Sequence, residues 1–108
     1  MLDVLILILN VRRYMKQCLK IKVFGQVQGT GYREFAKKAA HKLEIEGTAQ
    51  NIEDGSVVIY ACGDSNNLDS FLDELYKGPK NAHIKNIEAE PFLSEKDFRG
   101  VFRVIGFE

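Results

Sequence analysis

Short stretches in which apolar residues alternate with polar ones predict half-buried strands. In the first of them, Leu19, Ile21 and Val23 alternate with two lysines. Asp54-Gly55 lies between two later apolar stretches, and an Asp-Gly pair in such a place predicts a hairpin. Strands are therefore expected near residues 19–23, 45–51, 56–62, 83–90 and 101–107.

Two other segments carry apolar residues at helical spacing. The first is expected to form a helix over roughly 32–43, where the apolar or small residues are Tyr32, Phe35, Ala36, Ala39 and Leu43. The second helix is expected over about 66–77. Ser65 is a good N-cap residue for it, and Gly78-Pro79 ends it.

The order of the elements is strand, helix, strand, strand, helix, strand and a terminal strand. This order predicts an α+β fold of the ferredoxin-like, split β-α-β type (βαββαβ). Its mixed, largely antiparallel sheet is covered by two helices on one face and carries a short terminal strand. The chain has 108 residues, which fits one domain. We assign this domain to residues 15–108.

Residues 1–14 are predicted to be an N-terminal extension. Their apolar run lacks the basic start of a signal peptide and is too short to span a membrane. We interpret Met15 as the natural start of the protein and residues 1–14 as the product of an upstream start. Mass spectrometry of the native protein tests this interpretation, because a product that retains Met1 would contradict it.

The predicted topology brings two polar segments to one edge of the sheet. The first strand leads into the glycine-rich stretch 25–31 and the start of a helix, and the second strand returns to the same edge at Asn51. A helix N-terminus offers unpaired N–H groups and partial positive charge. Glycines let the amides of the preceding loop converge on an anion, and Arg33 adds a planar set of donors that matches phosphate oxygens. Residues 25–33 are therefore a candidate phosphate-binding loop.

This pattern is weak by itself. The stretch has neither the spacing of a Walker-type nucleotide loop nor that of a dinucleotide-binding loop. A solvated helix residue at Arg33 and a turn residue at Asn51 are the plainer interpretations.

Charge is unevenly distributed although the net charge is zero. Residues 12–42 hold nine Lys or Arg and one acid, whereas residues 43–108 hold six Lys or Arg and thirteen acids. An RNA-binding surface is one interpretation, but the aromatic motif of RNA-binding ferredoxin-like modules is absent. The two cysteines, Cys18 and Cys62, lack the spacing of zinc or redox motifs, so no metal site is expected.

Three sequence blocks together resemble the acylphosphatase family. The first is Gly25-Gln26-Val27-Gln28-Gly29-Thr30-Gly31-Tyr32-Arg33, which is similar to the loop G-x-V-Q-G-V-x-[FY]-R of that family. The second block spans residues 47–57 and resembles G-x-[VA]-x-N-x-x-[DN]-G-x-V. The third spans residues 78–84 and resembles G-P-x-x-A-x-V. The blocks occur in the family's order and cover most of the chain from residue 19 to residue 107.

The resemblance implies hydrolysis of acyl phosphates without a metal or other cofactor. It implies that Arg33 binds the phosphoryl group and that Asn51 orients the attacking water. The backbone N–H groups that complete the phosphate site are expected in Gln28, Gly29, Thr30, Gly31 and Tyr32. Two residues depart from the family pattern. Thr30 replaces a valine, and Thr48 stands where an aromatic residue is common.

We also expect a cytoplasmic monomer that acts on a small acyl phosphate, with no nucleic-acid or membrane partner. A phosphate-binding or acyl-phosphate-binding domain without turnover remains an alternative, as does an accessory domain for carbamoyl transfer on a separate polypeptide. In the implied topology Cys18 and Cys62 lie at the edge opposite the site, where a disulfide and two reduced thiols are both open.

Overall fold

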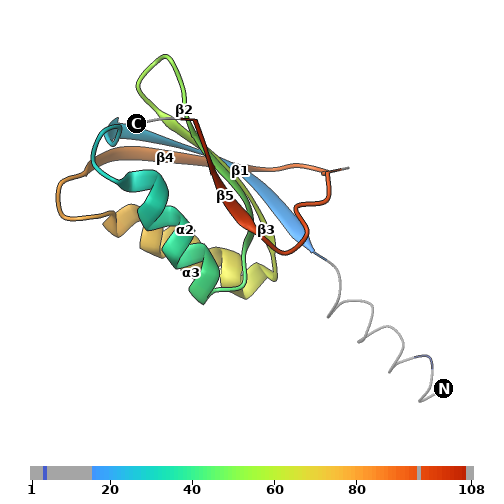
Figure 1. The fold of residues 1–108 in the computed structure, drawn as a ribbon. Coiled ribbons are helices and arrows are strands. Elements are labelled where there is room, and N and C mark those ends of the chain that lie inside the picture. The colour runs from blue at the N-terminus through green and yellow to red at the C-terminus, as the bar shows by residue number, and fades with distance from the viewer. Residues whose placement is uncertain (1–3, 5–15, 95, 107–108) are drawn as a thin grey trace.

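The computed structural model describes residues 4, 16–94 and 96–106 (Figure 1). Apart from Val4, the predicted extension over residues 1–14 lies outside these described residues. The elements follow the predicted order. They are β1 (Gln17–Gln26), α2 (Tyr32–Lys42), β2 (Glu46–Asn51), β3 (Val57–Gly63), α3 (Ser65–Lys77), β4 (His83–Pro91) and β5 (Phe102–Ile105).

The strands form one mixed sheet in the order β4-β1-β3-β2-β5. All neighbouring pairs are antiparallel except β2 and β5, which run parallel. Both helices lie on the same face of the sheet (Figure 1). The structure therefore confirms the predicted ferredoxin-like α+β fold, including the short terminal strand.

The core lies between the sheet and the two helices. Ile21 and Val23 of β1 and Ile59 of β3 are fully buried on this face, and they pack in one cluster with Phe71 and Leu75 of α3. The lysines that alternate with them in β1 point to the opposite face. The period-two pattern therefore places one apolar row against the helices, which is the main source of stabilisation for a two-layer domain.

Gly25 belongs to strand β1, which corrects the expectation that the glycine-rich loop begins there. At this point β1 has an irregular register with β4, between Phe24 and Gly25. A Cβ atom on Gly25 would lie 2.1 Å from the carbonyl oxygen of His83, and the φ angle of Gly25 is +137°. Only glycine permits this close approach of two strands. The connecting loop therefore begins after Gln26.

The N-cap of α3 is Asp64, where the sequence pattern favoured Ser65. The carboxylate of Asp64 accepts a hydrogen bond from the backbone N–H of Asn66 at 2.9 Å. Aspartate and serine are both good N-cap residues, so two adjacent candidates leave the first helical residue ambiguous by one position.

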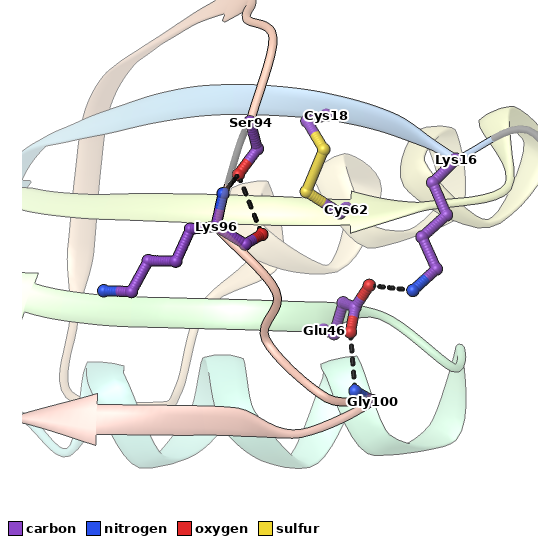
Figure 2. Close-up of a disulfide and its surroundings, with 7 residues drawn as sticks. All are labelled: Lys16, Cys18, Glu46, Cys62, Ser94, Lys96 and Gly100. Carbon is purple, nitrogen blue, oxygen red and sulfur yellow. Dashed lines mark hydrogen bonds and ion pairs between the residues drawn. A yellow bond between two sulfur atoms is a disulfide. The ribbon is translucent and has the colours of Figure 1, made fainter.

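A buried carboxylate connects β2 to the loop that precedes β5. Glu46 is 5% exposed, and its Oε2 accepts a hydrogen bond from the backbone N–H of Gly100 at 2.6 Å. Its Oε1 is paired with the ammonium group of Lys16 (Figure 2). The backbone N–H of Gly47 also donates to Val101 O at 3.0 Å. These contacts fix the start of β5 against β2.

Cys18 and Cys62 are directly opposite each other in the β1–β3 pair and form a disulfide (Figure 2). The bridge lies on the face of the sheet away from the core, near Glu46. It joins residues separated by 44 positions, so it closes a long loop in the unfolded chain. Such a loop loses conformational entropy when it is cross-linked, which raises the free energy of the unfolded state.

We expect reduction of this disulfide to lower the free energy of unfolding by about 2–4 kcal/mol. The measurement is urea unfolding with and without reductant, for the wild type and for a variant that combines Cys18→Ala and Cys62→Ala. Reductant should shift the midpoint of the wild type toward that of the variant and leave the variant unchanged. Two reactive thiols in wild type denatured without reductant would contradict the bridge.

Candidate active site

The loop between β1 and α2 is built by two glycines and one threonine. Gly29 and Gly31 have φ angles of +74° and +79°, in the left-handed region that favours glycine. The hydroxyl of Thr30 donates a hydrogen bond to the carbonyl oxygen of Val27 at 2.5 Å, and the Val27 side chain is buried in the core. Thr30 therefore closes the loop upon itself.

The loop leads directly into the N-terminus of α2. Gly31 is the N-cap residue, and having no side chain it cannot cap the helix. Its carbonyl oxygen accepts the helix hydrogen bond from Phe35 N at 2.9 Å. A helix N-terminus without a side-chain cap is a favourable position for an external acceptor, and the helix dipole favours one that is negatively charged.

Arg33 lies in the first turn of α2 and is 2% exposed. Its Nη1 donates a hydrogen bond to the carbonyl oxygen of Ile105, in β5, at 2.6 Å. This contact directs the guanidinium group along the sheet side of the helix, toward the end of the β2–β5 pair. A solvated position for Arg33, the plainer interpretation of the sequence, does not apply.

Asn51 is the last residue of β2 and lies at the same end of the sheet. It pairs with Val57 of β3, whose side chain is fully buried against the helices, so Asn51 shares the helix-covered face. Ile105, which contacts Arg33, pairs with Gln50, the residue before Asn51. The structure therefore brings the guanidinium group of Arg33 to the strand pair that ends at Asn51.

Figure 1 shows the loop before α2 and the β2–β3 turn at one end of the sheet. The side chain of Gln28 connects them. Its Nε2 donates to the carbonyl oxygens of Ile52, at 2.7 Å, and of Ser56, at 3.0 Å. The sequence pattern assigned Gln28 only a backbone role, and its side-chain contacts were not foreseen.

The model of the acylphosphatase family matches residues 19–104 of this sequence. The chain belongs to the acylphosphatase family. An acylphosphatase of Thermotoga petrophila is 46% identical over 79 residues, which are 73% of this chain and 88% of that protein. One of Oceanobacillus iheyensis is 41% identical over 80 residues, with the same shares covered. Family membership makes this chain an acylphosphatase-type hydrolase.

A solved structure gives the same result. The acylphosphatase of Bacillus subtilis superposes with a TM-score of 0.78 and 32% sequence identity, and covers 85% of this chain and 100% of its own. The likeness therefore extends over most of this acylphosphatase-family chain.

The side chain of Tyr32 lies between the two helices of the acylphosphatase fold. Its side chain is 1% exposed, and the phenol donates a hydrogen bond to the carbonyl oxygen of Leu75, in α3, at 2.7 Å. Burial of the phenol raises its pKa well above the usual range, so the group stays neutral. Tyr32 therefore anchors α2 to α3 through its side chain.

Asp54 holds the tip of the β2–β3 turn. Its Oδ2 lies 2.8 Å from the ammonium nitrogen of Lys22, in β1, and its Oδ1 accepts hydrogen bonds from both the hydroxyl and the backbone N–H of Ser56. The hydrogen bond from Lys22, followed by those from Ser56, lowers the pKa of the Asp54 carboxyl well below its ordinary value. The turn that follows Asn51 is thus attached to β1.

The cysteines of this acylphosphatase-family chain take no part in the candidate site. Cys18 is the second residue of β1 and Cys62 the second-last residue of β3, and the other ends of these two strands carry the glycine loop and the β2–β3 turn. Within the described residues, no group of three or more His, Cys, Asp or Glu side chains is suited to hold a metal ion. Among the same residues, no helix is long and apolar enough to cross a membrane.

We expect Asp54→Asn to lower stability at neutral pH and to have little effect in strong acid. The pKa of Asp54 is lowered in the folded protein, so its charge stabilises the fold above the ordinary value of 3.8, and this contribution is lost as the pH falls below that value. Asparagine retains an acceptor for Ser56 N and removes the charge that Lys22 contacts.

The measurement is the urea midpoint between pH 7 and pH 2 for the wild type and the variant. The difference in urea midpoint between the wild type and Asp54→Asn should become smaller as the pH falls below 3.8. Asp69→Asn, an exposed change in α3, serves as the matched control and should show no such narrowing. A difference that is constant with pH would show that the ion pair does not stabilise the turn.

Proposed function

We propose that the protein hydrolyses acyl phosphates by direct attack of water on the phosphoryl group. In this proposal Arg33 and the backbone N–H groups of residues 28–32 bind the phosphoryl oxygens, and the side-chain amide of Asn51 orients the water. The observation that carries the proposal is the buried guanidinium group of Arg33, which lies beside an uncapped helix N-terminus and next to the strand that ends at Asn51.

The bond changes in this reaction are simple. The water oxygen forms a new bond to phosphorus, and the bond from phosphorus to the acyl oxygen breaks with both electrons leaving on the carboxylate. A carboxylate is a good leaving group because its conjugate acid has a pKa of about 4. One proton of the water moves to a phosphoryl oxygen, so inorganic phosphate and a free carboxylate are the products.

This chemistry places few demands on the protein. The substrate is already activated, so the site has mainly to hold the phosphoryl group, align the water and stabilise negative charge that spreads over the phosphoryl oxygens. Donors in a partly buried position act more strongly on that charge than they would in water. Arg33 and the amides at the start of α2 meet this requirement without an acid–base pair of side chains.

Independence from metal ions, a cytoplasmic location and a monomeric state remain predictions. So does broad use of acyl phosphates, because a loop at the edge of a sheet offers few side chains to the acyl group. Binding of acyl phosphates or phosphate without turnover is the competing function. Retention of both Arg33 and Asn51 favours hydrolysis, since binding alone requires only the loop and the arginine.

The test is hydrolysis of benzoyl phosphate in the presence of EDTA. We expect the wild type to be active, and Arg33→Ala and Asn51→Ala each to lower kcat/KM by roughly 100-fold or more, because each removes a group that contacts charge or water in the transition state. Circular dichroism checks that the variants fold.

Matched controls are Arg103→Ala in β5 and Asn86→Ala in β4, two exposed residues of the same types. They should retain wild-type activity. A folded wild type that binds phosphate and does not hydrolyse the substrate would establish the competing function. Activity that disappears with EDTA and returns with a divalent cation would overturn the metal-free mechanism.

A further inference from the structure

The side chain of Gln28 bridges the two halves of the candidate site. Its Nε2 lies 2.7 Å from the carbonyl oxygen of Ile52 and 3.0 Å from that of Ser56. Both partners are acceptors, so the –NH₂ group of the amide, with its two hydrogens, must face the turn. The side chain thus uses both of its donors on the segment that follows Asn51.

These two carbonyl groups lie where the β2–β3 turn begins and ends. Ile52 directly follows Asn51, and Ser56 directly precedes Val57, the partner of Asn51 in the sheet. The turn closes on itself there, because the backbone N–H of Ile52 donates to Ser56 O at 2.9 Å. Gln28 therefore contacts the turn at the position that determines the direction of Asn51.

The tip of the same turn is held independently. Asp54 is bound to Ser56 and to Lys22 of β1, and neither contact involves the phosphate loop. The sheet register sets the overall position of the turn, and the side chain of Gln28 adds a direct link from the phosphate loop to the residues that flank Asn51 and its partner Val57. Gln28 is also a residue of that loop, so its backbone is part of the proposed phosphate site while its side chain reaches the water-orienting segment.

We propose that Gln28 is a positioning residue for acyl phosphate hydrolysis, whose side-chain amide holds Asn51 at the distance and direction from the phosphate loop that in-line attack of water requires. The inference rests on the proposed function. A displacement of about 1 Å in a reacting group lowers rates by up to about 100-fold. Loss of the Gln28 side chain should therefore appear in kcat, whereas phosphate binding by backbone amides and Arg33 should persist.

The experiment is a double-mutant cycle of Gln28→Ala and Asn51→Ala, with kcat for benzoyl phosphate and inhibition by inorganic phosphate measured in each variant. We expect Gln28→Ala to lower kcat by about 10-fold to 100-fold and to change the inhibition constant of phosphate by less than about 2-fold. In the Asn51→Ala background, Gln28→Ala should lower kcat by less than about 2-fold, because the Asn51 amide that Gln28 positions is absent.

Two further variants separate positioning from folding. Gln28→Glu keeps the shape of the side chain but presents acceptors to two carbonyl groups, so kcat should fall at pH 7 and recover in part as the pH approaches 4 and the carboxyl gains a proton to donate. Gln50→Ala is the matched control. Gln50 precedes Asn51, is exposed and lies on the opposite face of β2, so kcat should be unchanged.

Three results would overturn the inference. They are an unchanged kcat in Gln28→Ala, an equal loss in both backgrounds of the cycle, and a loss confined to phosphate inhibition. Failure of the proposed function can be told apart from failure of the role of Gln28, because it appears as an inactive wild type or an unaffected Asn51→Ala variant. Either of these outcomes also overturns this inference. An active wild type with an impaired Asn51→Ala variant and an additive cycle would reject only the role of Gln28.

Discussion

Antiparallel pairing of β1 with β3 in the middle of the sheet determines which loops and turns lie together at each end of the sheet. The register runs from Gln17 opposite Gly63 to Val23 opposite Val57. It places the glycine loop, which leaves β1, beside the turn that enters β3. It also turns one apolar row to the helices, and a shift by one residue would direct that row to solvent. The core and the candidate site are therefore specified by the same hydrogen-bonded register.

Burial of a guanidinium group shapes the site in a different way. Removing a cation from water is unfavourable by several kcal/mol unless good partners replace the water. Arg33 is held between α2 and the parallel β2–β5 pair, where the carbonyl oxygen of Ile105 is one of its partners. The glutamate that fixes the start of β5, Glu46, thus supports the environment of Arg33 from the opposite end of the strand. Preorganised donors of this kind need little rearrangement when an anion arrives.

The sequence was sufficient for the element order, the topology and the meeting of the glycine loop with Asn51, because hydrophobic periodicity and connectivity determine them. Details that depend on contacts between distant segments could not be predicted from the sequence. The sequence pattern places Gly25 in the loop, and only the carbonyl group of His83, which lies where a side chain would be, assigns it to β1. The side chain of Gln28 has many conformers in isolation, and only the folded β2–β3 turn selects one.

Thr30, Arg33 and the cysteines also show the difference between what a local pattern predicts and what only the folded chain determines. The sequence marks Thr30 only as a departure from the family pattern, and the structure shows that its hydroxyl donates to Val27 O within the loop. No local pattern separates a buried Arg33 from a solvated one, since its burial comes from β5, about seventy residues away in sequence. Topology allowed the cysteines to meet, and the register places them directly opposite each other.

The disulfide shortens the covalent path between segments of this chain that are far apart in sequence. Val23 and Val57 are far apart in sequence, yet each lies five residues from one half of the bridge. In the oxidised chain, the covalent path from Val23 to Val57 through the disulfide is as short as the loop of a hairpin. Pairing of these two residues therefore closes only a short loop, and the entropic penalty of loop closure is small. Both Arg33 and Asn51 lie inside the covalent ring, whereas α3, β4 and β5 lie outside it. Loosening of those outer elements therefore leaves the two site segments tethered to each other.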